Sequence, residues 1–184
     1  MTEPLDPAPG RVLVAVPSLV DPNFEESAVL LCRHHPEEGA VGLILNRPLG
    51  LPLRQLLPDA AGAGDLDLCW GGPVGLERLH ALHGGGPDLA ESIEVCAGVA
   101  FGGTIEDLLR LRTEGRPVRV FLGYSGWEGG QLERELAEGT WLVHPGGAEA
   151  AFDPDPATQW QRLAAAIDPT LAWLRHRPED PERN

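Results

Sequence analysis

The chain has 184 residues and a formal net charge of −14, from 28 acidic side chains against 14 basic ones. All the basic side chains are arginines and neither half of the chain is basic, so we expect no direct nucleic-acid binding. Apolar residues make up 42% and charged residues 23%, which is typical of a globular domain. The 23 glycines and 18 prolines follow no period, which excludes a collagen-like chain.

The first residues, MTEPLDPAPG, lack the basic and apolar regions of a secretion signal, and no apolar run approaches the roughly 20 residues of a spanning helix. Cys32, Cys69 and Cys96 are widely spaced in apolar runs, which is typical of buried free thiols. We therefore expect a cytoplasmic protein without a membrane partner. Residues 1–9 are expected to be disordered or extended, 10–167 to form one domain, and 168–184 to form an extension with a short helix and a frayed tail.

Three early segments are expected to be strands: 11–17, 27–32 and 40–46. Both alternating faces of each are apolar, which is typical of strands that are covered on both sides in the middle of a sheet. The link at 34–39 is short and rich in turn residues, so it predicts an antiparallel hairpin between the second and third strands.

The next segments are shorter and richer in glycine. A short helix is predicted over 52–57, and strands over 66–70, 78–83 and 93–101. Thr104 is expected to cap a helix in which Ile105, Leu108 and Leu109 form an apolar stripe, ending at Gly115 and Pro117.

The last third predicts a strand at 118–122, a turn at 123–127, a helix over about 129–138 and a strand at 141–144. Asp155-Pro156 is expected to open a further helix with Trp160 on its apolar face, and a short helix is expected over 171–176. Strands and helices alternate irregularly, which favours an α+β fold.

The turn predicted at Gly123-Tyr124-Ser125-Gly126-Trp127 is the first candidate for a site. A strand that passes directly into a helix would present free backbone amides to an anion. Ser125 invites comparison with the nucleophile elbow GxSxG, but the spacing does not match. On the following helix Gln131 and Glu135 lie one turn apart, with Arg47 as a possible partner for Glu135.

Two other strand ends are expected to meet this turn, at Asn46-Arg47-Pro48 and at Gly71-Gly72-Pro73. If the three segments converge on one edge of the sheet, they line a cleft. The candidate ligand-binding residues are Asn46, Arg47, Pro48, Gly71, Gly72, Pro73, Gly123, Tyr124, Ser125, Gly126, Trp127, Gln131 and Glu135.

Histidine spacing suggests metal ligands only superficially. Glu77-x-x-His80 and His80-x-x-His83 have the spacing of ligand pairs on a helix, but this segment is predicted to be a strand, where residues three apart point to opposite faces. His34 and His35 are expected at a hairpin tip and to point in two directions. We expect no metal site and no cofactor, and the chain has no Walker or dinucleotide-binding glycine motif.

In order and spacing, several stretches resemble the YqgE/AlgH family of small bacterial proteins: GRVLVAVPSLVDPNFEESAVLL, GAVGLILNRP, GGPV, FLGYSGWEGGQLEREL and the Trp160 helix. The resemblance covers about 10–167. It implies a mixed, strongly bent sheet that curls toward a barrel, flanked by helices, in a family without an established activity, one member of which has been linked to transcriptional control. The family commonly carries Ala at position 125, which weakens the case for Ser125 as a nucleophile.

Three functions remain open. The first is a binding or regulatory protein with a cleft for a small molecule or peptide, acting on transcription only indirectly, as a monomer or weak homo-oligomer. The second is an enzyme such as a hydrolase, with Glu135 as base and the turn amides as oxyanion donors. The third is a DNA-binding regulator, which the acidic composition disfavours.

Overall fold

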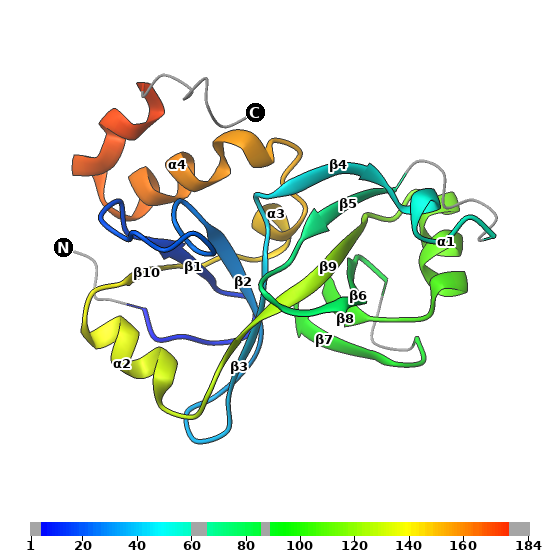
Figure 1. Ribbon diagram of the computed structural model, residues 1–184, viewed down its shortest axis with the longest axis horizontal. Helices are drawn as coiled ribbons and strands as arrows, with labels where there is room; N and C mark the ends of the chain where they lie inside the picture. The colour runs from blue at the N-terminus through cyan, green and yellow to red at the C-terminus, as the bar shows by residue number, and fades with distance from the viewer. Residues whose placement is uncertain (1–4, 60–65, 86–88, 177–184) are drawn as a thin grey trace.

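The computed structural model describes residues 5–59, 66–85 and 89–176 (Figure 1). Its strands form one open sheet in the order β10-β1-β2-β3-β9-β6-β8-β7, with β4 and β5 joined to it through β9. Within the described residues β5 and β9 run parallel and the other strand pairs run antiparallel. The strands are β1 Val12–Ala15, β2 Ala28–His35, β3 Gly39–Ile44, β4 Pro48–Pro52, β5 Asp67–Trp70, β6 Val74–His83, β7 Ser92–Cys96, β8 Val99–Gly102, β9 Val118–Trp127 and β10 Trp141–His144.

Helices flank this sheet, so the expected α+β class is confirmed. The α-helices are α1 Ile105–Thr113, α2 Gln131–Ala137, α3 Ala148–Ala151 and α4 Pro156–Ile167, and the 3-10 helices are η1 Leu53–Gln55 and η3 Pro169–His176. Thr104 caps α1 as expected, since its hydroxyl accepts a hydrogen bond from the Asp107 amide. Pro156 opens α4 as expected.

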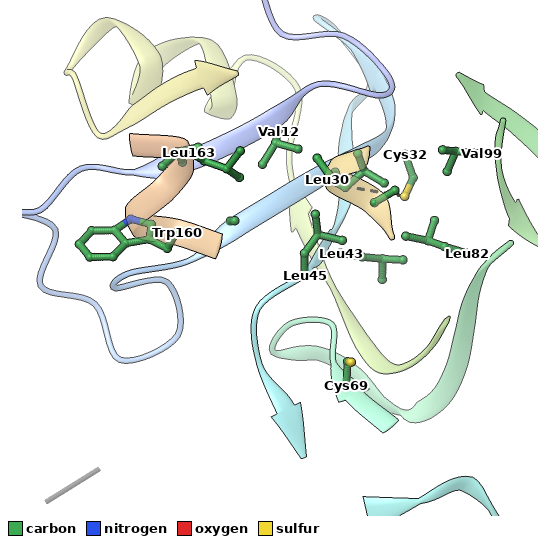
Figure 2. Close-up of a cluster of buried hydrophobic side chains, with 14 of the residues drawn as sticks. Val12, Leu30, Cys32, Leu43, Leu45, Cys69, Leu82, Val99, Trp160 and Leu163 are labelled. Carbon is green, nitrogen blue, oxygen red and sulfur yellow. Dashed lines mark hydrogen bonds between the residues drawn. The ribbon is translucent and has the colours of Figure 1, made fainter. Parts of the chain in front are cut away.

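The strands β10, β1, β2 and β3 form what we call the covered half of the sheet, because helices lie on both of its faces. Trp160 and Leu163 of α4 pack on one face, in the cluster that contains Val12 and Leu30 (Figure 2). Leu132 of α2 packs on the other face. The two faces of β1 and β2 are therefore buried in different clusters, as their doubly apolar sequence predicts.

The strands β4 to β8 form the open half, which has α1 as its main helix (Figure 1). Its own cluster is smaller, with Leu53, Leu66, Leu68 and Val120 buried at its centre. The exposed apolar side chains of this half include Leu49, Leu51, Val74 and Leu76. Its strands therefore carry less apolar cover than those of the covered half.

Strand β9 belongs to both halves. Its first part, residues 118–122, pairs with β5 and β6, and its last residues, 125–127, pair with β3. The sheet also curls back on itself, because Cys32 of β2 shares one core cluster with Val95 of β7 and Val99 of β8. The strand order nevertheless ends at β10 and β7, so the sheet is bent but not closed.

The structure corrects several sequence-based boundaries. Residues 123–127 are not a turn that leads into a helix, because they continue β9. The strand expected over 93–101 is a hairpin of β7 and β8, turned at Gly98 with a φ of +78°, which glycine adopts readily. The short helix expected over 52–57 is the 3-10 turn η1, preceded by an unexpected strand, β4.

No helix in the described parts of the chain is long and apolar enough to cross a membrane. Cys32, Cys69 and Cys96 carry free thiols, and the first two are buried.

Candidate functional site

A groove of about 820 Å³ lies where the β2–β3 hairpin, the end of β9 and the start of α2 meet. Its size is within the range of small-molecule sites. The hairpin supplies residues 33–35 and 38–41, β9 supplies Tyr124, Gly126 and Trp127, and Val74 and Gln131 complete the wall together with Glu128.

Several polar side chains of this groove have no hydrogen-bond partner within the described residues. They are the exposed guanidinium group of Arg33, the hydroxyl group of Tyr124 and the exposed carboxylates of Glu38 and Glu128. Arg33 lies opposite Val41 in the hairpin, so a cation and an apolar side chain stand side by side. This pairing suits a ligand that is anionic at one end and apolar along its body.

Glu135 holds the base of the groove in place by hydrogen bonds to the buried indole rings of Trp127 and Trp141. Its carboxylate accepts hydrogen bonds from Trp127 Nε1 at 2.9 Å, from Trp141 Nε1 at 2.8 Å and from Gln131 Nε2 at 2.9 Å. Gln131 in turn accepts a hydrogen bond from the Glu128 amide. The partners of Glu135 in these contacts differ from the Arg47 side chain expected from the sequence. To act as a general base, Glu135 would have to lose these hydrogen bonds.

His34 ties α2 to the hairpin. Its Nε2 lies 2.7 Å from the Glu133 carboxylate, so the two walls of the groove are joined by a polar contact between β2 and α2. His35 Nδ1 accepts a hydrogen bond from the Glu37 amide. Both histidines therefore hold the hairpin tip in place.

Asn46 and Arg47 hold a different segment, the loop 20–27. The Asn46 side chain accepts from the Ala28 amide and donates to the Glu26 carbonyl. Arg47 donates to the Glu25 carbonyl at 2.9 Å, and its guanidinium lies 5.1 Å from the centre of the Trp70 ring. This loop carries Phe24, whose ring packs against Trp127 and Trp141. Asn46 and Arg47 thus hold the loop whose Phe24 packs against Trp127 of the groove.

Gly71, Gly72 and Pro73 lie where β5 meets the bend of β9. A side chain at Gly71 would place its Cβ 2.3 Å from the Gly123 carbonyl oxygen, so the two backbones touch. Ser125 is fully buried and donates to the Gly71 carbonyl at 3.0 Å. These glycines allow close backbone approach, and Ser125 joins two strands.

The structure thus places four of the thirteen candidate residues on one groove: Tyr124, Gly126, Trp127 and Gln131. Glu135 lies directly behind them, and the described lining of the groove includes neither Asn46-Arg47-Pro48 nor Gly71-Gly72-Pro73. Arg33, which lines the groove, was missed. The available signal was its place opposite Val41 in a predicted hairpin. Within the described residues no group of three or more His, Cys, Asp or Glu side chains could hold a metal ion.

The fold and groove define an α+β protein built on an open, bent, mostly antiparallel sheet, with a concave surface where its two halves meet at β9. The chain belongs to the AlgH-like family (DUF179), whose model matches residues 12–172. This confirms the resemblance read from the sequence.

Relatives and solved structures agree with this assignment. The chain is 35% identical to the UPF0301 protein CT0663 of Chlorobaculum tepidum, over 96% of this chain and 95% of that protein. The solution structure of the AlgH protein from Pseudomonas aeruginosa matches with a TM-score of 0.73 and 33% identity, covering 98% of this chain and 99% of that one. The crystal structure of DIP2367 from Corynebacterium diphtheriae is similar in fold, with a TM-score of 0.77 and 22% identity, covering 96% and 95%.

Proposed function

We propose that this chain is a binding protein whose groove, between the β2–β3 hairpin and the end of β9, takes a small organic anion with a flat apolar body. The observation that carries the proposal is the presence in one groove of the Arg33 guanidinium and the Tyr124 hydroxyl, neither hydrogen-bonded within the described residues, beside apolar walls. Arginine binds carboxylates through paired N–H donors.

The apolar part of such a ligand would lie along Val41, Val74 and the rings of Tyr124 and Trp127. The fixed base supports this mode of binding, because Trp127 is held by Glu135 and by Phe24 and cannot move freely. A preordered wall lowers the entropy that binding must overcome.

The test is an NMR titration of the ¹⁵N-labelled full chain with aromatic carboxylates, starting with benzoate and indole-3-acetate. We expect shifts in the amides of residues 33–41 and 124–128. Arg33→Ala should weaken binding by about ten- to a hundredfold, the usual cost of losing a hydrogen bond to a charged group.

Arg112→Ala is the matched control, since this exposed arginine lies on α1, outside the groove. It should leave the affinity unchanged. Titrations in which no carboxylate moves the groove amides, or in which both arginine variants behave alike, would contradict the proposal.

In this view the protein is cytoplasmic and any effect on transcription is indirect, through the ligand or a protein partner. The free thiols of Cys32, Cys69 and Cys96 support a reducing compartment. The net charge of −14 argues against contact with DNA. A gel shift with purified protein at physiological salt should therefore show no complex, and a salt-dependent complex would favour the DNA-binding alternative.

A further inference from the structure

A second, smaller pocket lies in the open half and is separate from the groove. It has a volume of about 260 Å³ and lies between β6, β8, β9 and the start of α1. Its walls are almost entirely apolar, formed by Leu79, Phe101, Ile105, Leu108 and Val120. The volume is below the range of most drug-sized sites, so any ligand must be compact.

One polar side chain, His80, interrupts these apolar walls. Its ring stacks on Phe101, with centroids 5.7 Å apart and planes at 13°, and meets Tyr124 edge-on at 5.4 Å. These contacts fix the orientation of the imidazole. Its Nε2 atom is buried and has no hydrogen-bond partner within the described residues.

His83, three residues further along β6, shows how a buried imidazole is normally satisfied. Its Nδ1 accepts a hydrogen bond from the Gly85 amide at 3.2 Å, and its Nε2 lies 2.9 Å from the Ser92 hydroxyl. A buried polar atom without such partners is uncommon and is a reason to look for a ligand. In His80 that atom belongs to a residue that lines a pocket.

We propose that this pocket binds a small neutral aromatic alcohol of the phenol class, with its ring between Phe101 and Leu108 and its hydroxyl group on His80 Nε2. A hydroxyl both donates and accepts, so it satisfies either tautomer of a neutral imidazole. Burial, and to a lesser degree Arg78, lower the pKa of His80, which keeps the imidazole neutral near pH 7. A charged ligand would lose its hydration without a counter-charge among the apolar walls.

The experiment compares phenol with toluene, which replaces the hydroxyl by a methyl group on the same ring. Both are titrated into the ¹⁵N-labelled full chain, and the amides of Phe101, Gly103 and Ile105 report occupation of the pocket. The ring nitrogens of His80 are followed at the same time. We expect phenol to shift the His80 Nε2 resonance and toluene to leave it nearly unchanged.

His80→Phe keeps an aromatic ring and removes the hydrogen-bonding nitrogen. The ratio of phenol affinity to toluene affinity should then fall by about tenfold, because the hydroxyl is buried without a partner. His176→Phe is the matched control: His176 is exposed at the end of η3, and its substitution should leave the ratio unchanged.

The proposal is wrong if neither compound moves the pocket amides, if only toluene does, or if the affinity ratio is the same in His80→Phe and wild type. Should His80→Phe fail to fold, the His80 Nε2 resonance of the wild-type protein decides: a phenol complex that leaves it unmoved overturns the proposal. The groove proposal is unaffected by any of these outcomes, since its probes are carboxylates and its readout lies in other residues.

Discussion

The covered half and the open half of the sheet bury their strands in different ways. In the covered half every residue of β1 and the first five of β2 are buried, because α4 packs on one face and α2 on the other. In the open half β4 is largely exposed, and β6 is buried only toward its end. Stability is therefore expected to come mainly from the covered half. The small pocket lies in the open half, whereas the groove lies where the β2–β3 hairpin of the covered half meets the end of β9.

The largest effect is expected from Trp160→Ala in the covered half. Trp160 is 2% exposed, and its indole donates to the Ala15 carbonyl at 2.8 Å. Removing it leaves a cavity and an unpaired carbonyl, so the free energy of unfolding in urea should fall by about 3–5 kcal/mol. Trp173→Ala is the control, because Trp173 is 57% exposed and its loss should cost about 0.5 kcal/mol or less. Equal losses would contradict the inference that the buried packing of Trp160 stabilises the covered half.

Glu135→Ala should come next. The substitution leaves the indole nitrogens of Trp127 and Trp141 without their shared acceptor, at about 1–3 kcal/mol for each buried donor. Urea unfolding, with tryptophan fluorescence as the probe, should show a loss of about 2–6 kcal/mol. Glu138→Ala, an exposed glutamate one turn further on, should change little. A Glu135 variant as stable as Glu138→Ala would show that the indoles do not depend on this carboxylate.

Thr104→Ala tests the open half, where a smaller effect is expected. The substitution removes the N-cap of α1 and should cost about 1 kcal/mol. Thr113→Ala at the other end of the same helix removes only a contact with the Leu109 carbonyl, so urea unfolding should detect a smaller change. If Thr104→Ala lowered the free energy of unfolding as much as Trp160→Ala, this would contradict the inference that the covered half contributes more stability than the open half.

The smallest expected effect is on the pH dependence of stability. Burial lowers the pKa of His83, so its protonation favours the unfolded chain. The contribution of His83 is therefore complete above the ordinary histidine pKa and is lost as the pH falls below it toward the folded-state value. Urea unfolding between pH 7.5 and 5.5 should show a shallower loss for His83→Gln than for wild type. His176→Gln, an exposed control, should follow wild type; a steeper loss for His83→Gln would contradict this sign.

The sequence predicted the features that depend on residues close together in the chain. The doubly apolar strands 11–17 and 27–32 were found in place because burial on both faces leaves a pattern in the sequence itself. The cap at Thr104 and the proline at 156 were found because a helix end is fixed by its own neighbours in the chain.

The features that the sequence did not predict depend on contacts between segments that are distant in the chain. Gly123 and Gly126 suggested a turn, yet Gly123 lets the backbone of β9 approach Gly72, and no local rule distinguishes these two uses of glycine. The same limit applies to the groove. Tyr124, Trp127 and Gln131 were named from the sequence, but the register of β3 on β9 was needed to place the hairpin that carries Arg33 beside them.

Because β9 pairs with strands of both halves, the two halves are not expected to fold as separate fragments. A fragment that ends before residue 118 would lack the strand that pairs with both β3 and β6, and each would then present unpaired backbone groups to other chains. Truncated versions should consequently self-associate rather than fold as smaller soluble units.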